Sequence, residues 1–237
     1  MIVAAHQPAY LPWLGYLDKM AKADVFVVMD DLQYEAQNFQ NRNRIKRNDG
    51  AAWVTVPLQH GPQTDRICDK RIENRANPRE HWQRKTLRQL EIHYGGTRFF
   101  ARYADELRAI YTCPWERLVD LDLCVLELAR RAFDIRVPIL RSSSLGLRGQ
   151  KTDRILDLCR ALGANCYLSG RGGSTSYLDV DLLRTNGVSV LWQEFEHPIY
   201  PQRYPSLGFV SRLAFVDLLC NCGPDSRDVL WSGGLAA

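Results

Sequence analysis

The sequence predicts an α/β protein with a mostly parallel sheet and helices on both faces. Short apolar runs alternate along the chain with segments whose apolar residues recur at helical spacing. The run over 24–31 is almost continuously apolar before it ends in two carboxylates, which is typical of a strand buried on both faces. Polar or glycine-rich residues follow several of these runs directly, and ligands bind there in sheets of this class.

The beginning of the chain shows the repeating unit of such a sheet. A strand is expected over 2–7 and ends at Pro8, which has no backbone N–H to donate. Apolar residues at helical spacing predict a helix over 13–23, and the run over 24–31 predicts the next strand. Strand, loop, helix and strand together indicate a β–α–β unit.

The rest of the chain continues this alternation. Further strands are expected over 51–59, 135–143, 166–170 and 188–194, and further helices over 78–90, 98–112, 114–133, 151–162 and 212–220. Asn77 suits a helix cap, and Pro78 and Pro114 suit a first helical turn. The helices within 78–133 are expected to form an insertion in a single domain over 1–237, because the chain offers no clear linker.

Composition and charge narrow the classes of partner. The formal charge of +4 is mild and the densest basic cluster, over 42–47, is short, so a small phosphate-bearing ligand is favoured over nucleic acid. No apolar run is long enough to cross a membrane and no signal peptide is evident, so we expect a cytoplasmic protein. Seven cysteines, an odd number, argue against a disulfide framework. The sequence leaves open whether the chain forms a homo-oligomer.

The first candidate site is the loop that follows the first strand. His6 ends that strand and is the expected general base, while Gln7 and Tyr10 are expected to orient the substrate. Trp13 and Tyr16 follow, where two prolines stiffen the backbone and the N-terminus of the next helix favours an anion. Tyr10 is assigned to the catalytic group with His6. The alternative interpretation is a rigid turn with a structural histidine.

Two further candidate sites follow along the chain. Asp30 and Asp31 end a buried strand, where carboxylates hold a metal, a ribose or an amine, or else only cap a turn. Asn41, Arg42 and Arg44 alternate in a way that presents donors to phosphate or carboxylate, or else form a solvated charged loop. Both groups are assigned to substrate binding.

The later candidates lie in loops beside strands and helices. Lys151 closes a serine- and glycine-rich stretch that could cradle an anion, although its spacing is not that of a P-loop. Ser169 and Tyr177 flank a glycine-rich segment that suits close backbone approach or a gating loop. His197 is a second expected base, and Gln202 is expected to bind substrate. All the candidates are expected to converge around one cavity.

Several segments together resemble one protein family. They are HQPAYLPWLGY at 6–16, QNRNRIK at 40–46, WVTVPL at 53–58, HW at 81–82, YLSG at 167–170, YLD at 177–179, HPIYPQ at 197–202 and VDLLCNCG at 216–223. In these segments the chain is similar to the WbqC-like family over nearly its whole length. Members are encoded among genes for O-antigen, other surface polysaccharides and some natural products. The resemblance therefore implies modification of an activated sugar or a similar small molecule.

A fainter resemblance concerns the fold. The run Trp13-Leu14-Gly15-Tyr16-Leu17 lies where nucleotidylyltransferase-like enzymes have a His-x-Gly-His-Leu motif, after a first strand and at the start of a helix. Trp13 and Tyr16 replace both histidines. The resemblance therefore implies a related fold but not the usual phosphate chemistry.

The candidate residues favour a group-transfer enzyme that uses neither a cofactor nor a metal. The leading hypothesis is acyl or aminoacyl transfer to an amine of a nucleotide-linked sugar or a natural-product precursor, with His6 as the base. In this hypothesis Arg42, Arg44 and Lys151 hold phosphates of the donor or the acceptor.

Three alternatives remain at this point. The first is an ATP- and Mg²⁺-dependent ligase or nucleotidyl transferase in which Asp30 or Asp31 holds the metal. The second uses a thiol nucleophile, either Cys113 or Cys166, beside a histidine. The third is a protein that binds a sugar nucleotide without catalysis.

Overall fold

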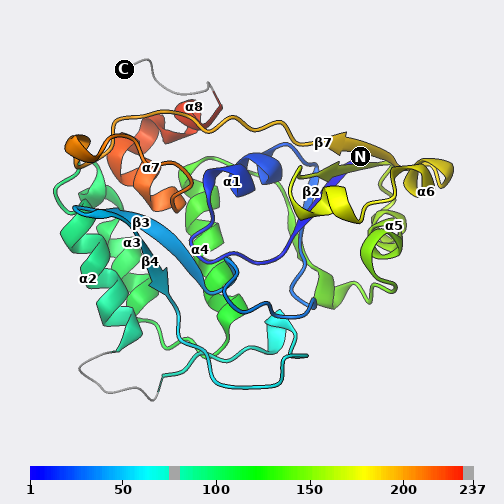
Figure 1. The fold of residues 1–237 in the computed structure, drawn as a ribbon, viewed down its shortest axis with the longest axis horizontal. Coiled ribbons are helices and arrows are strands. Elements are labelled where there is room, and N and C mark those ends of the chain that lie inside the picture. Colours follow the sequence, from blue (N-terminus) through cyan, green and yellow to red (C-terminus); the bar gives the residue numbers. More distant parts are fainter. Residues whose placement is uncertain (75–80, 232–237) are drawn as a thin grey trace. The chain divides into compact units, whose positions relative to one another are not determined.

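The computed structural model describes residues 1–74 and 81–231, which divide into two compact units (Figure 1). Unit 1 comprises Met1–Gln7, Gly15–Leu32 and Ile135–Phe195. Unit 2 comprises Pro8–Leu14, Gln33–Asp134 and Glu196–Ala237. The single domain expected over 1–237 stays a prediction.

Unit 1 is built on a parallel sheet, which confirms the predicted α/β class. Its five strands are β1 (Ile2–His6), β2 (Val25–Val28), β5 (Ile139–Arg141), β6 (Cys166–Ser169) and β7 (Ser189–Trp192). They lie in the order β5-β2-β1-β6-β7, and every neighbouring pair is parallel. Ala4 of the central strand pairs with Phe26 on one side and with Leu168 on the other.

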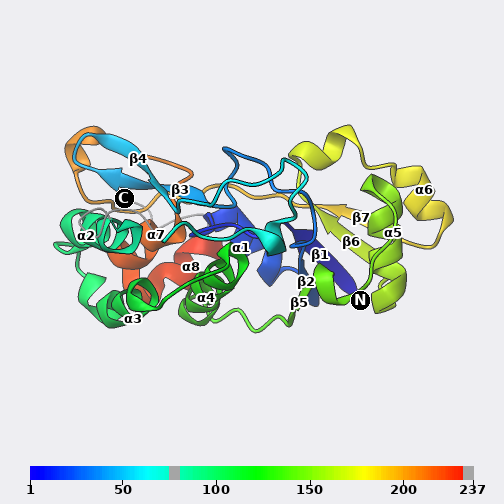
Figure 2. The same ribbon diagram turned by 90° about the horizontal axis from the view of Figure 1, so that it is seen from below.

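Helices cover both faces of this sheet. The helices of unit 1 are α1 (Leu14–Ala21, all but Leu14 in this unit), α5 (Lys151–Leu162) and α6 (Val180–Thr185). Val3 and Val27 form one core cluster with Ile155 of α5. Phe26 points to the opposite face, because side chains alternate along a strand. There it contacts Tyr16 of α1 with ring centroids 5.2 Å apart, and Figure 2 shows α1 and α5 on opposite sides of β1.

The order of the strands reverses between β1 and β6. From β1 the chain passes through α1 to β2, and β5 extends the sheet further on that side. It then returns through α5 to β6 on the other side of β1, and α6 leads on to β7. A crevice forms at such a reversal because the connections leave in opposite directions, and ligands bind there beyond the carboxyl ends of the strands.

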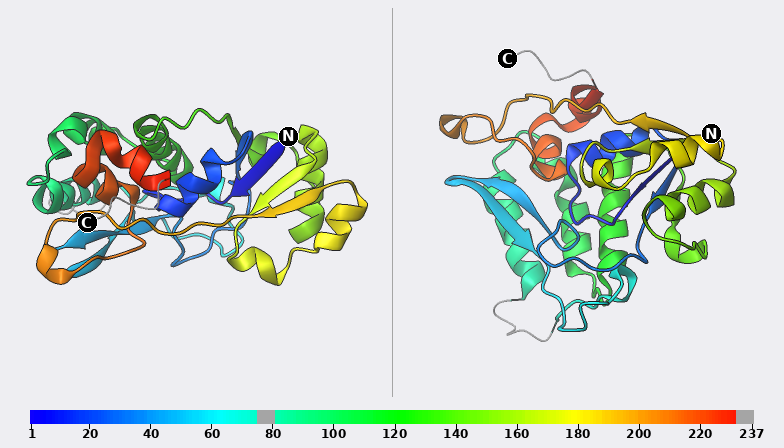
Figure 3. Two further views of the ribbon diagram at one scale, coloured as in Figure 1. Left: turned by 90° about the horizontal axis from the view of Figure 1, so that it is seen from above. Right: turned by 45° about the vertical axis from the view of Figure 1, so that its right-hand side comes forward.

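Unit 2 combines an antiparallel hairpin with helices. The hairpin is β3 (Arg42–Arg47) and β4 (Gly50–Thr55), and the helices are α2 (Trp82–Tyr94), α3 (Phe100–Thr112), α4 (Leu118–Ala132), α7 (Phe215–Cys222) and α8 (Ser226–Trp231). Arg44 pairs with Trp53 across the hairpin. The hairpin contacts α2 and α7 (Figure 3).

Short 3₁₀ helices occur in the connections of both units. They are η1 (Ile67–Asp69), η3 (Ser142–Ser144), η4 (Gly173–Ser176), η5 (Pro205–Leu207) and η6 (Gly223–Asp225). Within the described ranges, every helix is too short or too polar to cross a membrane.

The expected start of one helix at Pro114 is wrong. Helix α4 begins at Leu118, because the residues before it pair with another segment. The Leu118 N–H donates to the Lys70 carbonyl at 3.0 Å, and the Glu116 carbonyl accepts from the Ile72 N–H at 2.8 Å. These extended backbone bonds exclude a helical turn at 114–117. The expected cap and first turn at 77 and 78 lie outside the described residues.

Candidate functional site

The carboxyl ends of β1 and β6 bring the first candidate residues together in unit 1. His6 is the last residue of β1, and Ser169 is the last residue of β6. Since the register pairs Ala4 with Leu168, Ser169 continues its strand beside Ala5. His6 and Ser169 therefore lie at the reversal of strand order, where sheets of this class bind ligands.

The His6 ring is oriented by its own backbone neighbour and by α1. Its Nδ1 lies 3.0 Å from the Gln7 carbonyl oxygen, which can only accept, so in the neutral ring Nδ1 carries the proton. Nε2 then carries the lone pair that a general base uses. The Tyr16 ring packs against the imidazole with centroids 4.9 Å apart.

Lys19 is a functional candidate that the sequence did not single out. It is buried on α1, and its Nζ donates to the Ala5 carbonyl at 2.8 Å, directly behind His6. Burial and the positive charge of Lys19 together lower the pKa of His6 to about 4. Burial also lowers the pKa of Lys19 to about 8. At neutral pH the site therefore holds an ammonium beside a neutral imidazole.

Gln193, directly after β7, ties this edge of the sheet to α1. Its N–H donates to the Ser169 carbonyl at 2.7 Å, and its Nε2 donates to the Gly15 carbonyl at 2.8 Å and to Asp18 Oδ2 at 2.7 Å. Asp18 also forms an ion pair with Lys22. The sequence could have indicated Gln193 as a candidate, because it is a polar residue immediately after a strand.

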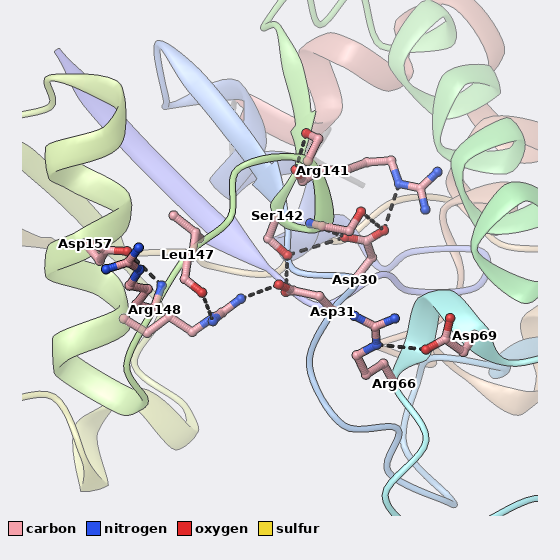
Figure 4. Close-up of polar contacts among 12 residues, drawn as sticks. Asp30, Asp31, Arg66, Asp69, Arg141, Ser142, Leu147, Arg148 and Asp157 are labelled. Carbon is pink, nitrogen blue, oxygen red and sulfur yellow. Dashed lines mark hydrogen bonds and ion pairs between the residues drawn. The ribbon is translucent and has the colours of Figure 1, made fainter.

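Asp30 is fully buried and its carboxylate is surrounded by donors (Figure 4). Oδ2 accepts from Arg141 Nε at 2.7 Å and from Ser143 Oγ at 2.9 Å. Oδ1 accepts from the Ser143 N–H at 3.0 Å and from Ser142 Oγ at 3.4 Å. Each oxygen thus has two partners, and the carboxylate fixes the segment after β5 to the end of β2.

Asp31 makes a second connection of the same kind. It accepts from Ser142 Oγ, and it forms an ion pair with Arg154 Nη2 at 2.5 Å. Arg154 Nη1 in turn donates to the Leu147 carbonyl at 3.0 Å. Together the two carboxylates hold the loop before α5, as expected if they cap a turn. Asp30 accepts two hydrogen bonds on each oxygen, and Asp31 accepts one on each.

The loops of unit 1 that contain Lys151 and Tyr177 lie next to each other. Lys151 is exposed at the start of α5 with a left-handed backbone (φ 50°). Thr152 Oγ1 donates to the Tyr177 carbonyl at 3.0 Å and accepts from the Asp179 N–H at 2.9 Å. The Tyr177 side chain remains exposed, so both predicted ligand residues are accessible.

Tyr10 lies in unit 2 and is fully buried there. Its hydroxyl is 2.6 Å from the Tyr111 hydroxyl. Asn43 holds the loop containing Tyr10, because its Nδ2 donates to the Leu11 carbonyl at 2.6 Å. Asn41 Nδ2 donates to the Val56 carbonyl at 2.8 Å. The two asparagines therefore fix backbone segments rather than face solvent.

Arg42 and Arg44 form a cationic and aromatic surface with Trp53. The Arg42 guanidinium lies 4.3 Å from the centroid of the exposed Trp53 ring, and that of Arg44 lies 5.9 Å away. Phe39 contacts Trp53 on one side and Trp13 on the other, with centroids 5.7 Å and 5.3 Å apart. This surface can present cations and ring faces to a planar or anionic ligand.

His197 is engaged at both ring nitrogens. Nδ1 lies 2.9 Å from the Pro198 carbonyl, and Nε2 accepts from the Arg212 N–H at 3.1 Å. Burial lowers its pKa, so the ring is neutral and donates at one nitrogen while accepting at the other. This arrangement fits a structural histidine that fixes the segment 197–212.

Gln202 belongs to a buried network around Asp217. Asp217 accepts from Tyr94 at 3.0 Å, Tyr200 at 2.9 Å and Gln202 Nε2 at 2.7 Å. Lys46 Nζ donates to Gln202 Oε1 at 3.1 Å. Burial raises the pKa of Asp217 to about 6. Residues from three of the quoted sequence segments and α2 thus join in one polar core network.

The predicted site residues fall into two groups. Unit 1 contains His6, Gln7, Tyr16, Asp30, Asp31, Lys151, Ser169 and Tyr177, and unit 2 contains Tyr10, Trp13, Asn41, Arg42, Arg44, His197 and Gln202. Their convergence around a single cavity stays a prediction.

Comparisons with known proteins agree with the quoted motifs. The model of a family described as "WbqC-like protein family" matches residues 7–229. The chain is 33% identical over 233 residues to "Uncharacterized protein Rv1507c" of Mycobacterium tuberculosis, covering 96% of each chain. No solved structure matches.

Replacement of Asp30 by asparagine should destabilise the protein. The amide would direct N–H groups at the donors of Arg141 and Ser143, so we expect the free energy of unfolding to fall by about 2 to 4 kcal/mol. Urea unfolding measures this change. The matched control is Asp181→Asn, at an exposed carboxylate, which should change stability by less than about 0.5 kcal/mol. Equal effects of both substitutions would refute the structural role.

Replacement of Lys19 by methionine should raise the pKa of His6 from about 4 by part of the difference from the ordinary value of 6.5. The substitution removes a nearby positive charge that disfavours imidazolium, while burial, the larger cause of the low pKa, remains. Histidine ring signals in an NMR titration report this pKa directly, and a His6→Gln spectrum assigns them. Lys22→Met, at a half-exposed lysine of the same helix, is the control. A His6 pKa that stays the same in Lys19→Met contradicts the prediction.

Proposed function

This chain belongs to the WbqC-like family, and we propose that it is a group-transfer enzyme that acts on a small activated metabolite. The form we favour is acyl or aminoacyl transfer to an amine of a nucleotide-linked sugar or a natural-product precursor. One observation carries the proposal: a neutral imidazole, His6, ends the central strand of a parallel sheet where the strand order reverses.

The proposed reaction uses His6 as the base. The amine nitrogen attacks the carbonyl carbon of an activated acyl donor, forming the C–N bond and a tetrahedral oxyanion. His6 Nε2 takes a proton from that nitrogen, and collapse of the oxyanion restores the carbonyl and expels the leaving group with its electron pair. The low pKa of His6 keeps the imidazole in its basic form at neutral pH.

Several groups are suited to hold the activated metabolite. Gly170 follows Ser169 without a side chain, so a phosphate or ribose can approach the backbone at the end of β6. Lys151 offers an exposed cation at the start of α5. In unit 2, Arg42 and Arg44 are the proposed phosphate ligands, and their stacking on Trp53 also suits a planar base.

The strand order favours nucleotide binding in general, so an ATP-dependent ligase or nucleotidyl transferase is the second candidate. That reaction needs carboxylate oxygens for Mg²⁺. Asp30 has two donors on each oxygen, and Asp31 is engaged by Ser142 and Arg154. A metal at Asp30 would have to displace its donors, and Asp31 is already paired with the cation of Arg154, so the geometry supports acyl transfer more strongly.

The test is an assay of the purified full chain with activated acyl donors and nucleotide-linked amino sugars. Mass spectrometry should detect a product heavier than the acceptor by one acyl group minus one hydrogen. His6→Ala should lower kcat/KM by about 10²- to 10⁴-fold, the usual effect of losing a general base. His60→Ala, at an exposed histidine, should leave it unchanged.

The pH dependence gives a second readout of the same assay. Because the pKa of His6 is lowered to about 4, kcat/KM should decline only as the pH falls towards 4, and not around 6.5. Turnover that persists in His6→Ala would remove His6 as the base. Binding of the sugar nucleotide without turnover by any donor would favour the non-catalytic alternative, and a product that requires ATP and Mg²⁺ would favour the ligase.

A further inference from the structure

Asp122 of α4 is a buried carboxylate that the preceding chemistry does not use. It is 2% exposed, and neither of its oxygens has a hydrogen-bond partner among the described residues. Asp30 and Asp217, which are equally buried, are fully hydrogen-bonded. An unsatisfied buried carboxylate is costly, and such a group in a native protein is explained by strain, an ordered water, a bound ion or ligand, or a reactive role.

The surroundings of Asp122 are polar on several sides. The Tyr10 and Tyr111 hydroxyls are hydrogen-bonded to each other, and the Asp122 charge acts on both phenols. These groups belong to α3, α4 and the loop at 8–14, all within unit 2. We call Asp122, Tyr10 and Tyr111 the Asp122 cluster.

A cavity of about 450 Å³ lies in the same unit as Asp122. It is lined by Tyr34 together with Gln33, Gln59 and Lys70. Burial is the main cause of the raised pKa of Tyr34, and the charge of Asp122 raises it further.

We infer that the Asp122 cluster binds a primary ammonium group. An ammonium has three N–H donors, and the cluster offers both Asp122 oxygens and a phenol oxygen as acceptors. A divalent metal fits less well, because in the described part of the chain no three His, Cys, Asp or Glu residues lie together to bind one. The assignment concerns unit 2 alone and is independent of the proposed function.

Burial of the carboxylate agrees with this inference. It raises the pKa of Asp122 well above the usual range, so without a cation the group is held as a neutral acid. A bound ammonium restores the ionised form, because an opposite charge at hydrogen-bond distance favours the carboxylate.

The inference is tested by binding of ethylammonium chloride to the full chain. Tetramethylammonium chloride at equal ionic strength is the matched probe, since it has the same charge but no N–H. The apparent Kd follows from the dependence of the unfolding temperature on probe concentration. We expect a saturable response to ethylammonium alone, and Asp122→Asn should weaken it on the order of tenfold or more.

Two further variants complete the experiment. Asp120→Asn makes the same substitution at an exposed position of α4 and should bind ethylammonium like the wild type. Tyr111→Phe removes one phenol oxygen and should weaken ethylammonium binding less than Asp122→Asn does. If Asp122→Asn does not fold, Tyr111→Phe still tests the inference. Equal responses to the two probes, or an undiminished response in Asp122→Asn and Tyr111→Phe, would overturn the inference.

The outcome separates this inference from the proposed function. His6→Ala should bind ethylammonium normally, because His6 is not part of the Asp122 cluster. Specific binding in a chain that shows no acyl transfer would support the ammonium site and count against the transfer. Acyl transfer in a chain that responds equally to both probes would refute the ammonium site and leave the transfer intact.

Discussion

The parallel ladders on both sides of β1 are the constraint on which the arrangement of unit 1 depends. β1 is paired with β2 along Val3–His6 and with β6 along Ile2–Ala4, so its backbone cannot shift without breaking two sets of hydrogen bonds. These ladders fix the imidazole of His6 at the end of a rigid strand. A side chain held in this way loses little freedom on binding a ligand, which is what a positioned base requires.

Buried charge divides the polar groups of the chain into two classes. Asp30 and Asp217 are each surrounded by several donors, which compensates their desolvation and gives them a role in holding segments together. Lys19 donates one hydrogen bond, to a carbonyl, and its charge adds to the effect of burial, which is the main cause of the low pKa of His6. Asp122 has no such compensation. The groups whose burial is least compensated are therefore the ones to which we assign chemistry or binding.

The parallel sheet could be predicted because strands that are buried on both faces appear in the sequence as apolar runs. Helix α5 could be predicted because Gly163 ends it, in the left-handed conformation that glycine favours (φ 66°). β3 was not resolved from the loop around it, because its exposed face carries Arg42 and Arg44 and only pairing with β4 makes it a strand. The position of His6 at a strand end followed from the local pattern. The engagement of His197 did not, since it depends on the backbone of Arg212, fifteen residues away. The sequence shows that Asp122 lies on the apolar face of α4. Its interest as a site depends on its burial, which only the structure shows.

The low pKa of His6 also bears on which acceptor the proposed enzyme can use. A base with a pKa of about 4 removes a proton effectively only from a group that is itself acidic. A hydroxyl acceptor must be deprotonated before or during attack, and this would demand a stronger base. An amine attacks with its own lone pair, and the nitrogen becomes strongly acidic once it bears a positive charge in the tetrahedral adduct. Burial and the charge of Lys19, which keep the imidazole neutral and weakly basic, therefore suit an amine acceptor better than an alcohol.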